Sequence, residues 1–313
     1  MKPSEPITIQ PRGALEIWRP LGPAFDGLGA TAMLNLGEVV FEQGRWKEAE
    51  QLFEQALPLN RRAFGPSHLR TVTNLNSLGN ISLATGDSQK AEDCYAEALL
   101  VERQLYPNDI QLARTLTGLA AVRMQSGRLD EALPLADEAL ALVLRTDGEN
   151  TPAAAVEYGN VAMVHRLAGR PARAIPLLRK ARAIDARVDP ADSLRMASLL
   201  SEEALALTDD EQFAPAESDL KSAMRLLARC RECDLQVAIA ESAFGYLRLR
   251  QKDYPKADRF LTEALAIEER SGSLSAYQIS GTLKMLSQAR AKERRHGEAA
   301  ELERRAAVSR TIH

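Results

Sequence analysis

The sequence predicts an all-α protein, a right-handed α-solenoid of about seven helical hairpins. Aromatic residues make up only 5% of its 313 residues and hydrophobic residues 45%, a composition that favours closely packed helices over sheets. Small residues recur every 41 or 42 residues along most of the chain, and apolar residues flank them at helical spacing. These observations together indicate a stack of similar helical units.

The period is carried by a short motif, Gly44-Arg-Trp-Lys-Glu-Ala49, whose alanine returns in every repeat. The alanines are Ala49, Ala91, Ala132, Ala174, Ala216, Ala257 and Ala299. A second alanine follows each of them by seven residues, from Ala56 to Ala306, and a Gly, Ala or Ser precedes each by twelve, from Gly37 to Ser287. Antiparallel helices approach to about 8 Å only where the contact residues are small, so the pattern predicts one helix crossing in each repeat.

Each repeat is therefore predicted to be a pair of antiparallel helices. Glycines, from Gly44 to Gly169, supply the turn in the first four repeats, and Pro171, Pro215 and Pro255 fall in the first turn of their second helices. The predicted pairs span 29–64, 68–106, 109–146, 151–187, 191–230, 233–271 and 274–311. Residues 1–20 contain four prolines and are predicted to be an irregular lead-in, with the repeat domain over 21–313.

The order of small residues, with Leu78 before Gly79 and Tyr95 after Ala91, resembles the tetratricopeptide repeat. The period near 42 and segments such as Phe-Gly-Pro-Ser-His-Leu at 64–69 look like the long-repeat variety found in kinesin light chains. The resemblance implies a superhelix whose first helices line a concave groove that binds peptides. It also implies a non-enzymatic scaffold for protein–protein interaction.

Charge and hydropathy exclude several classes of function. The chain has 40 basic and 43 acidic residues, a net charge of −3, so it has no overall cationic field for nucleic acid or an anionic membrane surface. No apolar run reaches the length of a membrane helix, and no export signal is visible, which makes the cytoplasm the default location. The sequence does not determine the oligomeric state.

The catalytic motifs are missing as well, so no enzyme, cofactor or metal site is predicted. Gly27-Leu-Gly29-Ala-Thr-Ala32 matches a loose dinucleotide pattern, but no predicted strand precedes it. The histidines never pair at i, i+4. Cys230 and Cys233 form a Cys-x-x-Cys motif, for which a structural metal site or a redox pair is the alternative. No second pair or nearby histidine completes a zinc site, and we expect ordinary thiols at the end of a helix.

The candidate peptide-binding residues lie at inward positions of the first helices in repeats one to four. They are polar, and Asn can donate to and accept from a peptide backbone without reading side chains. The set is Asn35, Asn76, Asn80, Arg114, Asn160 and Arg166. Residues such as Leu205 and Tyr246 could add apolar anchors, while repeats five to seven show a mixed set that includes Glu202, Ser242 and Lys284. Solvation of an exposed polar face is the competing explanation.

The leading function is thus a scaffold that holds a peptide or partner protein, whose identity the sequence does not give. The main alternative is the peptide-sensing or regulatory arm of a signalling or transcription-control system. That alternative needs an output domain, and about twenty residues precede the predicted repeats here.

Overall fold

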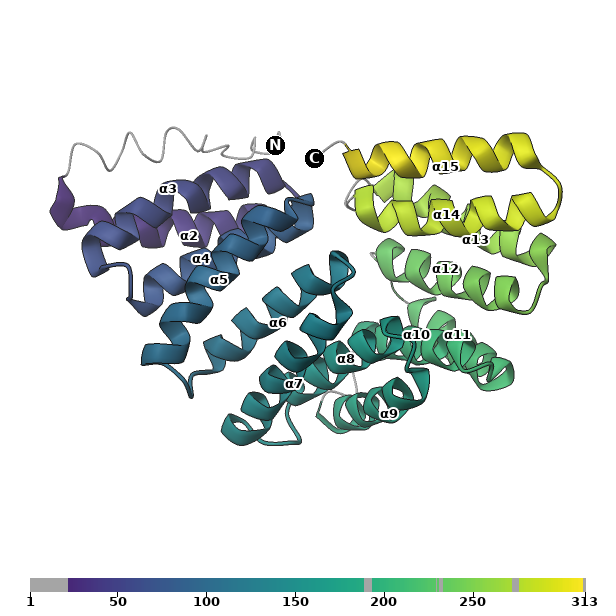
Figure 1. The fold of residues 1–313 in the computed structure, drawn as a ribbon, viewed down its shortest axis with the longest axis horizontal. Helices are drawn as coiled ribbons and strands as arrows, with labels where there is room; N and C mark the ends of the chain where they lie inside the picture. Colours follow the sequence, from purple (N-terminus) through teal and green to yellow (C-terminus); the bar gives the residue numbers. More distant parts are fainter. Residues whose placement is uncertain (1–21, 189–192, 229, 231–232, 272–275, 312–313) are drawn as a thin grey trace, which may run out of the picture. The chain divides into compact units, whose positions relative to one another are not determined.

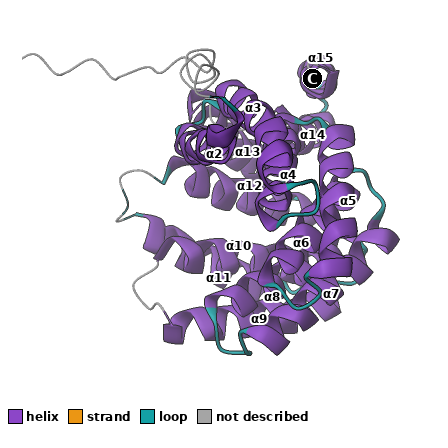
Figure 2. Ribbon diagram, turned by 90° about the vertical axis from the view of Figure 1, so that its left-hand side faces the viewer, coloured by secondary structure: helices purple, strands orange, loops and turns teal. Residues whose placement is uncertain are grey.

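The computed structural model describes residues 22–188, 193–228, 230, 233–271 and 276–311, and every regular element in them is a helix (Figure 2). The predicted lead-in at residues 1–20 lies outside the described residues.

Within the described residues seven helical hairpins follow one another, as predicted (Figure 1). A short 3-10 turn, η2 (Pro23–Phe25), precedes the first. The pairs are α2 (Asp26–Glu42) with α3 (Trp46–Phe64), α4 (Leu69–Thr85) with α5 (Ser88–Leu105), α6 (Ile110–Gln125) with α7 (Leu129–Thr146), α8 (Pro152–Leu167) with α9 (Pro171–Val188), α10 (Ser193–Asp209) with α11 (Phe213–Leu227), α12 (Asp234–Arg250) with α13 (Tyr254–Ser271), and α14 (Ala276–Lys292) with α15 (His296–Thr311). The predicted ends of each pair fall within about three residues of these bounds, within the usual uncertainty of helix termini.

The chain divides between Val122 and Arg123, inside α6, into two compact units. In the first unit α3 packs against both α2 and α4, so the first hairpin contacts the second. In the second unit α8, α10, α12 and α14, the first helices of four successive hairpins, contact one another in order. The second unit therefore contains a continuous layer of first helices.

The small residues mark the helix crossings, as the sequence predicts. A Cβ atom at Gly37 would lie 2.4 Å from the ring of Phe53, and one at Gly79 would lie 2.7 Å from the ring of Tyr95. The Tyr95 ring is held from its other side as well, because a Cβ at Gly118 would come within 2.4 Å of it. These contacts leave no room for a side chain, so only glycine lets the helices pack at this distance.

The turn inside each hairpin uses the left-handed backbone region throughout the described chain. Gly44, Gly86, Gly127 and Gly169 take φ values of 74°, 92°, 74° and 69° in the first four repeats. The same position in the last three repeats holds Glu211, Lys252 and Arg294, with φ values of 61°, 63° and 64°. The turn geometry is thus conserved along the chain although the residue that favours it is not.

Buried amides connect successive hairpins in the first unit. Asn60 donates to the Oδ1 atom of Asn74 at 3.3 Å, and Asn74 donates to the backbone oxygen of Phe53 at 3.0 Å. Asn76 and Thr115 exchange two hydrogen bonds, of 2.7 and 3.0 Å, between α4 and α6. These bonds provide partners for polar groups that would otherwise be costly to bury.

In the second unit, ion pairs connect successive hairpins, as the buried amides do in the first unit. The buried carboxylate of Asp185 accepts from Arg195 Nε at 2.5 Å, which joins α9 to α10. The buried carboxylate of Glu203 contacts Arg179 Nε at 2.8 Å and Arg182 Nη1 at 3.0 Å. The carboxylates of Asp185 and Glu203 therefore each have a cationic partner.

Candidate functional site

Three of the predicted residues are exposed on first helices of the first unit. Asn35 lies on α2, Asn80 on α4 and Arg114 on α6. The hydroxyl of Tyr95 donates to Asn80 Oδ1 at 2.6 Å, which fixes the orientation of the Asn80 amide. These side chains are accessible, and their role in peptide contact remains a prediction.

Asn76 differs from the other predicted residues because it is only 8% exposed. Its amide is engaged with Thr115, as described above, so it links two hairpins inside the first unit. We therefore leave Asn76 out of the surface proposed below.

Asn160 and Arg166 both lie on α8 in the second unit, and each lines a hollow. Asn160 donates to Glu157 Oε2 at 3.2 Å and faces the smaller hollow, of about 170 Å³, between α8, α9 and α10. Arg166 has 17% of its side chain exposed and lines the larger hollow.

The large hollow has a volume of about 690 Å³ and lies on the layer of first helices in the second unit. Its walls come from α8, α10, α12 and α14, with one residue from α13. The apolar part of the lining is Leu167, Leu205, Leu235, Ile239, Ala243 and Met285, and the polar part includes Arg166, Glu202, Ser242, Tyr246, Glu268, Thr282 and Lys284. A largely apolar hollow of this size with a few polar groups is typical of a ligand site.

Asp209, at the end of α10, joins the polar side chains beside the large hollow. Arg166 Nη1 lies 3.4 Å from Asp209 Oδ2, and the Tyr246 hydroxyl donates to Asp209 Oδ1 at 2.5 Å. Arg250 Nη1 donates to the Tyr246 oxygen at 3.1 Å and lies 3.5 Å from Asp209. This network positions Arg166 and Tyr246 in the wall of the hollow.

The acidic residues of the lining are in an apolar environment that disfavours their charge. Burial raises the pKa of Glu268 to about 7, although the Thr282 hydroxyl donates to its Oε1 at 2.8 Å and partly opposes this. Burial also raises the pKa of Glu202, and the nearby charge of Arg166, at 3.9 Å, partly offsets the effect. Burial therefore disfavours the charged form of both carboxyl groups in the lining.

Sequence reasoning did not choose the large hollow, although its signal was present. The sequence predicts Leu205 and Tyr246 as possible anchors, but it places the site on repeats one to four because the inward positions of repeats five to seven are mixed. A mixture of apolar and polar residues on successive first helices is what a ligand hollow requires.

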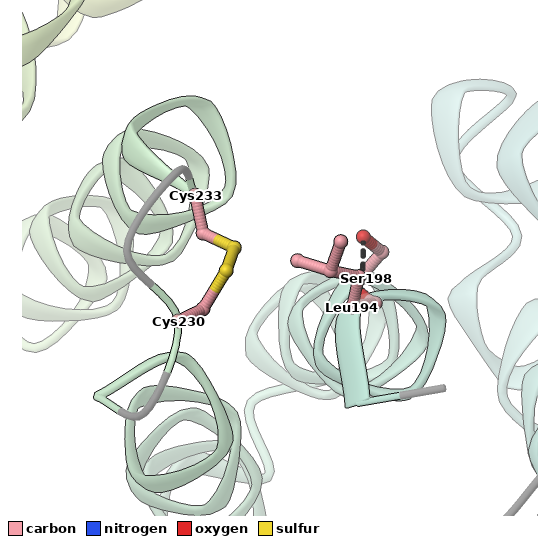
Figure 3. Close-up of a disulfide and its surroundings, with 4 residues drawn as sticks. All are labelled: Leu194, Ser198, Cys230 and Cys233. Atoms are coloured by element: carbon pink, nitrogen blue, oxygen red, sulfur yellow. Dashed lines mark hydrogen bonds between the residues drawn. A yellow bond between two sulfur atoms is a disulfide. The ribbon is translucent and has the colours of Figure 1, made fainter. Parts of the chain in front are cut away.

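The prediction of ordinary thiols at Cys230 and Cys233 is wrong. The two cysteines form a disulfide between the end of α11 and the start of α12, drawn beside Leu194 and Ser198 of α10 (Figure 3). Cys233 is buried in an apolar cluster with Leu200 of α10 and Leu227 of α11. The spacing gave the motif, and the positions of the two cysteines at the facing ends of α11 and α12 bring the sulfur atoms together. Cys94 is a buried free thiol.

The helical hairpins and the lining of the large hollow together define a helical-repeat protein with a candidate ligand site on its first helices. The comparisons with known proteins identify the repeat in part of the chain. Residues 30–99 and 111–187 match the family model described as Tetratricopeptide repeat. These residues therefore carry tetratricopeptide repeats, as the sequence predicts.

Three relatives illustrate the range of similar proteins. The clustered mitochondria protein homolog of Homo sapiens is 30% identical over 132 residues, which is 41% of this chain and 10% of that protein. The chain therefore matches about a tenth of that relative's length. A putative kinesin light chain with nearly identical TPR-like repeats, from Podosopora anserina, has a TM-score of 0.54 at 19% identity, covering 64% of this chain and 96% of that one.

The third is the Rap conjugation gene regulator of the plasmid pLS20, whose structure is in complex with the Phr* peptide. It has a TM-score of 0.68 at 16% identity, and the match covers 89% of this chain and 73% of that one. At these identities the two solved structures establish the shared fold.

The tetratricopeptide architecture is that of a protein-interaction scaffold and is in general non-enzymatic. None of the helices in the described residues is long and apolar enough to span a bilayer.

Proposed function

We propose that this protein is a non-enzymatic scaffold that binds a peptide or a segment of a partner protein on its first helices, with the large hollow as its principal site. The hollow is the observation that carries the proposal. Four successive first helices contribute to it, and its open, largely apolar lining can accept side chains from an extended or helical segment. A cytoplasmic location remains a prediction from the sequence.

Exposed apolar side chains in the lining support binding of a macromolecular segment. Leu167 is 44% exposed and Ile239 is 38% exposed, and both lie at the hollow. Removing such side chains from water on binding contributes about 25 cal/mol per Å² of apolar surface. Asn160 and Arg166, which the sequence predicted, lie on the same helix at the hollows and extend the proposed surface.

The exposed residues Asn35, Asn80 and Arg114 form the part of the proposal that belongs to the first unit. Each presents a polar side chain on a first helix, where it can bond to a peptide backbone. We propose them as secondary contacts, since the large hollow is lined by residues of the second unit.

The test is capture of partners by the full chain and by a double variant, Leu167→Ser with Ile239→Ser. The matched control is Leu100→Ser with Leu105→Ser, which removes two leucines of α5 that are even more exposed, at 64% and 54%, and are not part of the lining. All three proteins must give the same helical circular dichroism. We expect the hollow variant to lose its partners and the control to keep them. Equal capture by both variants would reject the hollow as the site.

A further inference from the structure

Lys284 of α14 is a cation at the large hollow that the rest of the described chain leaves without a partner. Its side chain is exposed and belongs to the lining, and it makes no hydrogen bond or ion pair with any described residue. It occupies the place that Ser242 takes on α12, one repeat earlier. A lysine here therefore adds a charge where the preceding repeat has a hydroxyl.

The other charged residues of the lining have partners of their own. Arg166 lies within 4 Å of the carboxylates of Asp209 and Glu202, and the Thr282 hydroxyl donates to Glu268. Burial raises the pKa of Glu268 to about 7 and also raises the pKa of Glu202. Lys284 is therefore the charged residue of the lining that is exposed and has no partner among the described residues, and it favours an anionic group beside it.

The apolar side chains next to Lys284 determine what must accompany that anionic group. Met285 follows Lys284 on α14, and Ile239 and Leu205 come from the two preceding first helices. A small inorganic anion would leave this apolar surface exposed to water. A peptide segment that combines apolar side chains with a carboxylate would cover it.

We propose that the large hollow binds a partner segment in which apolar side chains are flanked by aspartate or glutamate, with the carboxylate on the Lys284 ammonium. The apolar side chains pack against Leu205, Ile239 and Met285. This inference rests on the proposed function and adds to it the chemistry of the segment. A basic segment is the main rival, because Glu202 and Glu268 could receive it, but it would place a cation beside Arg166 and Lys284.

The probe is an array of short synthetic peptides in three sets, which share the same apolar cores and differ only in flanks of Glu, Gln or Lys. Binding of the full chain is measured at low and at physiological salt. We expect the Glu set to bind about two- to five-fold more tightly than the Gln set, the range for one exposed ion pair, and the Lys set to bind least. Salt should reduce the difference.

Variants of one residue identify the cation responsible. Lys284→Gln should remove the preference for the Glu set, and Lys284→Arg should retain it because the charge is kept. Lys292→Gln is the matched control, since Lys292 is an exposed lysine at the end of the same helix and is not part of the lining. That variant should bind all three sets as the unaltered chain does.

The outcomes separate the inference from the function on which it rests. If the three sets bind equally, if the Lys set binds best, or if Lys284→Gln keeps the preference, the inference is wrong while peptide binding stands. If no set binds, both the inference and the proposed function fail. Binding that survives Leu167→Ser with Ile239→Ser would also reject both, because the peptides would then be held elsewhere.

Discussion

The two units build the same helical hairpin but stabilise it differently. In the first unit glycine supplies the left-handed turns at Gly44 and Gly86, and buried amides such as Asn74 and Asn76 join successive hairpins. In the second unit carboxylate–arginine pairs such as Asp185–Arg195 do so, and its last three hairpin turns use ordinary residues in the left-handed region. Both units therefore share the small residues at the helix crossings, whereas the polar contacts between their hairpins differ.

This difference has a consequence for binding. The second unit carries the large hollow, and several charged residues around it, such as Arg166 and Asp209, already form a network. In the first unit Asn76 and Asn80 are engaged by Thr115 and Tyr95. In the first unit, polar side chains on the first helices thus bond to neighbouring helices of the same unit. The second unit, whose last three repeats diverge most, holds the better candidate site.

Removing an aromatic ring from a crossing is the change with the largest expected effect. Tyr95 is buried between Gly79 and Gly118, which have no side chains to fill the space, so Tyr95→Ala should lower the free energy of unfolding by about 3–5 kcal/mol. Tyr95→Phe removes only the bond to Asn80 and should cost about 0.5–1.5 kcal/mol. Urea denaturation measures both. Equal losses for the two variants would contradict the packing role of the ring.

The next largest effect concerns pH, because each unit contains buried carboxyl groups. Burial raises the pKa of Glu102 in the first unit, and those of Glu241 and Glu268 in the second, from 4.5 to about 7. The folded state then binds more protons than the unfolded state between these values. Stability is highest at or below pH 4.5 with respect to these groups and falls as pH rises through 7.

Replacing one of these carboxyl groups by an amide tests whether stability falls as pH rises, as predicted. Glu102→Gln should be more stable than the unaltered chain at pH 8, by at most about 3 kcal/mol, with little gain at pH 4.5. Glu268→Gln should behave likewise in the second unit, and Glu38→Gln, on an exposed position of α2, is the control. Denaturation at several pH values measures the difference. A gain that is the same at every pH would show that desolvation of the carboxylate is not the cause.

The disulfide should have a smaller effect. It closes a loop of four residues, for which chain entropy gives about 2 kcal/mol or less, so Cys230→Ser with Cys233→Ser should lower stability by no more than that. Reduction of the unaltered chain should have the same effect. Titration under non-reducing, denaturing conditions should find one free thiol, that of Cys94. Three free thiols would contradict the disulfide.

Substitutions in the left-handed turns should change stability least, and they compare the two units most directly. Lys252→Gly relieves a non-glycine residue at φ 63°, and we expect a gain of about 0.5–1 kcal/mol. The reverse change in the first unit, Gly86→Lys, should cost a similar amount or more, since Gly86 has φ 92°. Thermal denaturation measures both. A loss of stability on Lys252→Gly would show that its side chain contributes more than the backbone conformation costs.

The hairpins were predictable from sequence because small residues at a crossing are a local requirement that repeats in every unit. Gly37, Gly79 and Gly245 each meet a large side chain of the second helix, and the spacing alone revealed this. The site was less predictable, because a hollow depends on how several first helices meet. Whether Asn76 faces a groove or a neighbouring helix depends on the position of Thr115, 39 residues away. The Cys230–Cys233 bond depends on the connection between α11 and α12 in the same way.

Binding at the large hollow is the central claim, and photo-crosslinking tests it most directly. A benzophenone side chain is placed at Ile239 in the hollow, at Asn35 on α2, or at Leu100 on α5, in the otherwise unaltered full chain. We predict that the partner crosslinks most strongly from position 239, less from position 35, and not from position 100. Crosslinks from position 35 or 100 without any from position 239 would contradict the claim and place the binding surface outside the large hollow.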